Sequence, residues 1–163
     1  MWDVLAVRYG TRVTRKSECY LDFASHGEPD AAVGMDYFFY VLRDGERTVL
    51  VDTGFDPTVG ERRGRTTVCP PVEALALLGI RPEEVSLIVV THLHYDHIGN
   101  LAAFPEAELA VHERELAFRL GPDGLRPEHA AVVEADEIAH VVEARAEGRV
   151  RVLTGSGPVA PGI

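Results

Sequence analysis

Thr91-His92-Leu93-His94-Tyr95-Asp96-His97-Ile98-Gly99-Asn100 is the stretch of sequence that decides the fold of this chain. It directly follows Leu87-Ile88-Val89-Val90, a short β-branched apolar run bounded by polar residues. Such a run predicts a buried strand. Side chains just past the end of a buried strand commonly face a crevice in α/β proteins. The sequence therefore predicts functional side chains at a strand end.

The stretch places three histidines and one aspartate within six positions. Imidazole nitrogen and carboxylate oxygen are ordinary zinc ligands. In an extended segment His92 and His94 point the same way, and Asp96 continues that alternation. His97 breaks it at the start of an expected helix, so it approaches from another side. Buried imidazoles and carboxylates need partners, which packing alone does not supply. We predict that His92, His94, Asp96 and His97 are metal ligands, two for each of two ions.

The pattern His-x-His-x-Asp-His over residues 92–97 resembles the signature of the metallo-β-lactamase superfamily. Val51-Asp52-Thr53-Gly54 resembles the strand-end Asp-x-Gly element of the same superfamily. The likeness runs from about Tyr37 to the C-terminus and is greatest to N-acyl homoserine lactonase-type hydrolases. It implies an α/β fold of the αββα sandwich type. This chain resembles the first half of that sandwich, which is one mixed sheet with flanking helices.

The resemblance also implies a chemistry. It implies a zinc-dependent hydrolase with two ions in the complete site, which share a hydroxide that attacks the carbonyl of a small lactone or ester. Asp96 would pass a proton to the leaving group, and Asp52 would orient the 92–97 loop by hydrogen bonds. His94 favours zinc, since the diiron branch typically has Glu there. A glyoxalase II-like thioesterase and a truncated, non-catalytic metal-binding or interaction module remain open as alternatives.

The segment Pro161-Gly162-Ile163 ends the chain. In the family that this chain resembles, a similar segment is followed by a further histidine motif and by later Asp and His ligands. We therefore expect a single domain over residues 1–163 that is truncated at its C-terminus. A missing C-terminal half or a second copy in a homodimer would supply the remaining ligands. Half a sandwich would expose the apolar face of its sheet, and large exposed patches of this kind are rare in soluble monomers.

The composition of the chain limits the classes of partner that it is expected to bind. With 163 residues, one domain is the expectation, and 46% apolar and 26% charged residues are ordinary for a globular protein. The net charge of -10 argues against nucleic acid, whose binders carry basic surfaces. No apolar run is long enough to span a bilayer, and the N-terminus lacks the pattern of a signal peptide. These observations predict a small-molecule substrate, no membrane partner and a cytoplasmic location.

Periodicity predicts the remaining elements in outline. The expected strands lie at residues 2–9, 37–42, 48–51, 109–112 and 150–153, and the expected helices at 72–78, 98–104, 113–120 and part of 128–146. Residues 10–18 predict a turn or hairpin, and residues 20–36 and 55–67 predict loops. Residues 43–47 predict a hairpin connection, with Asp44-Gly45 as the turn signal. Arg62, Arg63 and Arg65 in the last loop are expected to be solvated, with contact to an anionic substrate as the alternative. Tyr95 either lines the site or points into the core.

Overall fold

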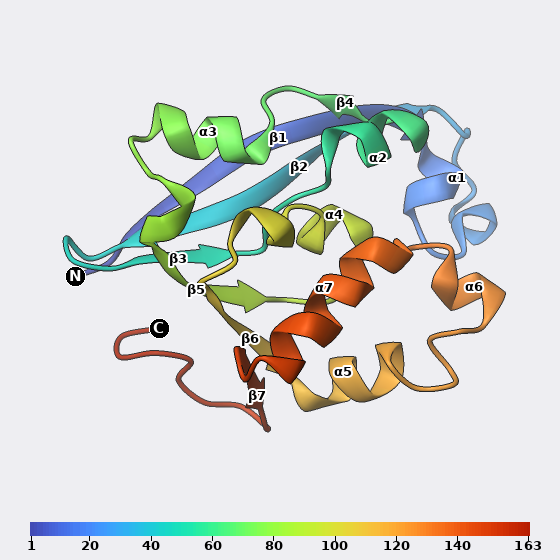
Figure 1. Cartoon of the computed structure of the whole chain (residues 1–163). Coiled ribbons are helices and arrows are strands. Elements are labelled where there is room, and N and C mark those ends of the chain that lie inside the picture. Colours follow the sequence, from blue (N-terminus) through green and yellow to red (C-terminus); the bar gives the residue numbers. More distant parts are fainter.

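One mixed β-sheet organises the chain in a computed structural model that describes residues 1–163 (Figure 1). Its seven strands stand in the order β4-β1-β2-β3-β5-β6-β7. The strands are β1 (Asp3–Arg15), β2 (Ala32–Arg43), β3 (Thr48–Val51), β4 (Thr66–Thr67), β5 (Val85–Val90), β6 (Glu108–His112) and β7 (Val150–Leu153). The helices are α1 (Lys16–Cys19), α2 (Pro57–Arg62), α3 (Pro71–Leu77), α4 (Tyr95–Ile98), α5 (Glu113–Arg119), α6 (Pro127–Ala130) and α7 (Ala135–Ala146). The predicted class, one mixed sheet with flanking helices, is confirmed.

The sheet changes from antiparallel to parallel at β3. Strands β4, β1, β2 and β3 pair antiparallel, whereas β3, β5, β6 and β7 run parallel. In the parallel part Val51 lies opposite Val89, and Val90 lies opposite Val111. The carboxyl ends of β3, β5 and β6 therefore meet at one edge, which is where ligand sites form in sheets of this type. The stretch 91–100 begins at that edge.

The two faces of the sheet are covered differently. A core of 22 buried residues fills the face on which α2, α3, α4, α5 and α7 pack (Figure 1). A smaller cluster of Leu42, Val49, Leu87 and Ala110 occupies the other face. The C-terminal segment after β7 packs against this second cluster through Val159, Ala160 and Ile163, together with Trp2 from the N-terminus. The apolar face expected to be exposed is thus covered in part.

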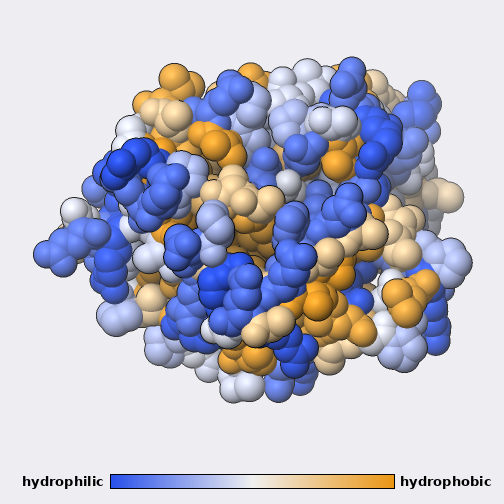
Figure 2. All heavy atoms as spheres, viewed as in Figure 1, coloured by the Kyte–Doolittle hydropathy of each residue, from blue (hydrophilic) through white to orange (hydrophobic).

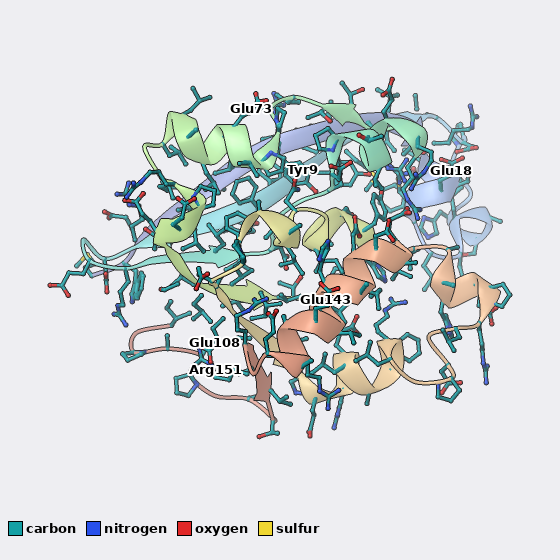
Figure 3. The ribbon with its side chains drawn as sticks, in the orientation of Figure 1. Tyr9, Glu18, Glu73, Glu108, Glu143 and Arg151 are labelled. Carbon is teal, nitrogen blue, oxygen red and sulfur yellow. The ribbon has the colours of Figure 1, made fainter.

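Glu108 and Arg151 mark this second face, on β6 and β7 beside the C-terminal segment (Figure 3). They form an ion pair at 2.7 Å, and Arg151 also donates a hydrogen bond to the Val159 carbonyl. Farther along the sheet, Phe38 and Tyr40 of β2 stay 41% and 42% exposed. On the helical side, Figure 2 shows hydrophilic residues over most of the surface, with apolar residues in separate patches.

The turn or hairpin predicted at residues 10–18 is wrong. Strand β1 continues to Arg15 and pairs with β2 over nearly its whole length, with one register shift between Arg8 and Gly10. Beyond the shift most side chains of β1 are polar, so periodic burial does not reveal this part of the ribbon. Gly10 is required at the shift, because a Cβ there would lie 2.5 Å from the ring of Phe55.

Two predicted loops contain regular structure. Residues 55–67 hold α2 and β4, and Asp56 caps α2 by accepting hydrogen bonds from the backbone N–H groups of Thr58 and Val59. The dipeptide Asp56-Pro57 is the usual signal for a helix start, although no apolar period follows it. The loop predicted at 20–36 ends early, since β2 begins at Ala32. The helix predicted at 98–104 is instead the end of α4 and a separate 3-10 turn over Leu101–Ala103.

The other predicted strands and helices are found within one to five residues of their expected ends. The Asp44-Gly45 turn is also present, and Asp44 accepts hydrogen bonds from the backbone N–H groups of Glu46 and Arg47. No helix combines the length and the apolar character that crossing a membrane requires.

Candidate metal centre

Asp52 joins the ends of β3 and β5. Its carboxylate is 4% exposed and accepts a hydrogen bond at 2.8 Å from the Thr91 backbone N–H and another at 2.7 Å from the Thr91 hydroxyl. The same carboxylate lies 2.7 Å from His97 Nδ1. Asp52 also has a φ of +63°, in the left-handed region that Asp and Asn enter more readily than most residues. This backbone turn aims the side chain back at the 91–97 loop.

His97 is oriented by that contact. With Nδ1 donating to Asp52, the Nε2 atom carries the free lone pair, and it lies 3.8 Å from Asp96 Oδ2. A carboxylate behind an imidazole fixes its tautomer and makes it a more basic ligand. Burial is the largest single influence and lowers the pKa of His97, but the hydrogen bond and negative charge of Asp52, with Asp96, outweigh it and raise the pKa.

The other two imidazoles lie beside His97. The ring centroids of His92 and His97 are 3.9 Å apart, and those of His92 and His94 are 4.3 Å apart. Burial, followed by the charge of His97, lowers the pKa of His92. Burial, followed by the charge of His92, lowers the pKa of His94 to about 4. Both rings are therefore neutral near pH 7, which is the state that binds a metal.

The atoms that these side chains offer are of the kind that binds a metal ion, and they lie in two pairs. His92 with His94, and Asp96 with His97, place two nitrogen or oxygen donors side by side. Across the whole chain, however, no three His, Cys, Asp or Glu side chains are grouped so as to hold one ion. Structural zinc sites have four ligands, and catalytic sites have three protein ligands and a water. The chain thus offers donor pairs of the right type, without a third protein donor for either pair.

Backbone contacts that the sequence did not predict hold the loop against the 52–56 segment. The amide of Asn100 donates hydrogen bonds to the carbonyls of Thr53, Gly54 and Phe55 at 2.9, 3.3 and 3.1 Å. The Thr53 backbone N–H donates to the His97 carbonyl at 2.7 Å. Gly99 allows the close approach, since a Cβ there would lie 2.4 Å from the Asp56 backbone nitrogen. The adjacent Gly-Asn pair was the available signal.

Two tyrosines fix the start of α4. The Tyr9 hydroxyl donates a hydrogen bond to the Asp96 carbonyl at 2.7 Å, and Figure 3 shows Tyr9 between β1 and the helices. Tyr95 is only 5% exposed, so it belongs to the core rather than to the lining of the site. Arg65 donates a hydrogen bond to the Tyr95 hydroxyl at 2.9 Å, and the guanidinium of Arg63 lies 4.2 Å from the centre of its ring.

Two of the three arginines predicted to be solvated are structural. Arg63 and Arg65 contact Tyr95, and Arg63 also forms an ion pair with Glu134. Arg62 pairs with Glu134 too, but its side chain is 61% exposed, so it is solvated as predicted. The prediction failed for Arg63 and Arg65 because a short basic cluster looks the same in sequence whether it is solvated or paired with distant residues.

Comparison with known proteins adds a family match. A model described as the metallo-beta-lactamase superfamily matches residues 35–158. Metallo-beta-lactamase domain-containing protein 1 of Mus musculus is 45% identical over 67 residues, which are 41% of this chain and 26% of that protein. N-acyl homoserine lactonase AiiB of Agrobacterium fabrum is 33% identical over 91 residues, 48% of this chain and 33% of that protein.

Solved structures resemble the whole chain. A quorum-quenching N-acyl homoserine lactone lactonase superposes with a TM-score of 0.70 at 20% identity, covering 98% of this chain and 60% of its own. AidC, a dizinc quorum-quenching lactonase, superposes with a TM-score of 0.68 at 15% identity and the same coverage, 98% and 60%. At these identities the likeness concerns the fold. The chain spans less than two thirds of the length of each of these proteins.

Proposed function

Because the chain belongs to the metallo-beta-lactamase superfamily, we propose that it carries the metal-binding half of a hydrolase site that acts on a small lactone or ester. Zinc is the proposed metal, with two ions in the complete site. His92 and His94 would hold one ion, and Asp96 and His97 the other.

The observation that carries this proposal is the gathering of His92, His94 and His97 at the carboxyl edge of the sheet, with ring centroids of neighbouring pairs 3.9 and 4.3 Å apart. Close packing of three half-buried polar rings gains little unless they bind metal ions, because a nitrogen removed from water needs a partner. The carboxylate of Asp52 behind His97 is the arrangement that orients a ligating imidazole.

Each residue of the proposed site has its own role. His92 and His94 offer neutral nitrogen donors at neutral pH. Asp52 holds the proton on His97 Nδ1, which leaves the lone pair of Nε2 free to bind a metal ion. When bound, zinc lowers the pKa of a coordinated water and stabilises negative charge on a carbonyl oxygen. The carboxylate of Asp96, 19% exposed at the edge of the site, is the group proposed to take up the proton that the attacking water loses and to hand it to the leaving oxygen.

The lactone or ester assignment draws support from the relatives, several of which are named N-acyl homoserine lactonases. A glyoxalase II-like thioesterase is the other enzyme candidate, because the same residues suit attack on a thioester carbonyl. Turnover of a set of N-acyl homoserine lactones against a glutathione thioester, by the zinc-loaded full-length protein in which the remaining ligands complete the site, separates the two. We expect the lactones to be turned over, and faster hydrolysis of the thioester would overturn that assignment.

The second candidate function is a non-catalytic metal-binding or interaction module, and one observation favours it. No three potential ligands converge on one ion within the chain. His94→Ala distinguishes the candidates, with His140→Ala as the control because His140 is 43% exposed and lies on α7. In the full-length protein with its remaining ligands, we expect His94→Ala to abolish hydrolysis and His140→Ala to leave it unchanged. Zinc binding without hydrolysis of any lactone, ester or thioester would instead establish the module.

A further inference from the structure

Helix α5 contacts the 91–97 loop through the side chain of Glu115. Glu115 accepts a hydrogen bond at 2.8 Å from the Leu93 backbone N–H, 22 positions earlier in the chain. The contact exists because α5 begins directly after β6, so its first turns stand at the same sheet edge as the 91–97 loop. Leu93 lies between His92 and His94, and its own side chain is completely buried in the core.

Glu115 is itself held in place. The oxygen that accepts from Leu93, Oε1, also accepts a hydrogen bond at 3.2 Å from Arg119 Nε, one helical turn along. The Arg119 side chain is 7% exposed and donates a second hydrogen bond, at 2.9 Å, to the carbonyl of His129. A buried guanidinium has one protonation state and needs an anionic partner. The pair therefore presents a fixed, charged acceptor to the Leu93 N–H.

The orientation of the Leu93 peptide decides where its neighbours point. In an extended segment alternate side chains face opposite ways, so a Leu93 side chain fixed in the core sends those of His92 and His94 outward together. The buried side chain alone leaves the peptide free to rotate about its long axis. A hydrogen bond on its N–H removes that freedom and sets the angle between the two rings.

We propose that Glu115 is a positioning residue for the metal centre, which holds His92 and His94 at the angle that lets both bind one ion. The role rests on the proposed function, since it has no meaning without a metal on this pair. It assigns a task to a residue whose hydrogen bonds go to the Leu93 backbone and to Arg119 rather than to a proposed ligand side chain.

Three variants of the 163-residue chain isolate the hydrogen bond. Glu115→Ala removes the acceptor and leaves the charge of Arg119 unpaired. Glu115→Gln also removes the negative charge, but its amide oxygen still accepts from Leu93. The two variants therefore differ in the hydrogen bond and share the loss of charge. Glu113→Ala is the control, because Glu113 is exposed on the same helix.

Two measurements compare the variants with the unsubstituted chain. Calorimetric titration with Zn²⁺ alone measures affinity, and hydrogen exchange of the Leu93 amide, followed by NMR on the metal-free chain, reports the hydrogen bond itself. We expect Glu115→Ala to weaken zinc binding by about tenfold to a hundredfold, the usual effect of removing a group that orients a ligand. We expect Glu115→Gln to stay within roughly threefold of the unsubstituted chain. The Leu93 amide should exchange faster only in Glu115→Ala.

Other outcomes would overturn the role. Equal weakening in Glu115→Ala and Glu115→Gln would show that charge matters and the hydrogen bond does not. Unchanged zinc affinity in Glu115→Ala, with faster exchange at Leu93, would refute the positioning role and leave the proposed function standing. An unsubstituted chain that binds no zinc would refute the proposed function, and the positioning role with it.

Discussion

Glu137 on α7 is a buried carboxylic acid without a partner. It is 6% exposed, and neither carboxyl oxygen has a hydrogen bond. It occupies the same face of α7 as Val141 and Ala144, which are also buried. Burial, and next the negative charge of Glu134, raises the pKa of Glu137 from 4.5 to about 8. The folded chain therefore keeps this group protonated at neutral pH.

That difference predicts the direction of a pH effect on stability. Between pH 4.5 and about 8 the folded chain binds a proton that the unfolded chain has released, so the free energy of unfolding falls as pH rises. One pKa unit corresponds to about 1.4 kcal/mol, which gives a loss of about 3 kcal/mol between pH 5 and pH 8. Glu137→Gln removes the titration and keeps the shape. We expect its stability advantage over the unsubstituted chain to grow by that amount across this range.

Urea unfolding at pH 5, 6.5 and 8 measures the effect, because the midpoint shifts with stability when the slope is unchanged. Glu143→Gln is the matched control, since Glu143 is 67% exposed on the same helix (Figure 3). We expect this control to stay within about 0.5 kcal/mol of the unsubstituted chain at each pH. A Glu137→Gln advantage that is the same at pH 5 and pH 8 would refute the reasoning.

Three further predictions concern the metal loop. Gly99→Ala should destabilise the chain by about 1 to 3 kcal/mol in urea unfolding, because its Cβ would lie 2.4 Å from the Asp56 backbone nitrogen; an unchanged midpoint would contradict this packing. Asp52→Asn keeps a residue that tolerates the left-handed backbone but loses the negative charge facing His97, so zinc affinity measured by calorimetry should fall by about tenfold to a hundredfold. Zinc at a hundred times its dissociation constant should add about 2.7 kcal/mol to the free energy of unfolding, and a chelator should remove that gain; equal unfolding midpoints with and without chelator would argue against a native-state site.

The parallel part of the fold was predictable because its strands are short, apolar and bounded by turn signals. The β5 run before His92 is an example, and it is present. In the antiparallel part, the hairpin between β2 and β3 was predictable from its Asp44-Gly45 turn signal. The long β1–β2 ribbon was missed beyond Gly10, because β1 is mostly polar there and is stabilised by pairing with β2. Pairing between distant segments leaves no periodic signal in either segment.

The candidate site, like the fold, was predictable from the sequence only in part. The donors in residues 92–97 follow from residue type and spacing, and the structure brings their side chains together. Two groups that hold them come from elsewhere in the chain, Tyr9 from β1 and Glu115 from α5. Each acts through a backbone group of the loop. Such contacts depend on tertiary structure, so no local sequence motif predicts them.

The central claim is that His92, His94, Asp96 and His97 bind metal. Calorimetric titration of the metal-free chain with Zn²⁺, alongside His94→Ala and His97→Ala, tests it most directly. We predict saturable binding by the unsubstituted chain that each substitution weakens by at least about tenfold, because each removes one of only two donors to an ion. Zinc binding that is equally tight in both variants, or absent from the unsubstituted chain, would contradict the claim.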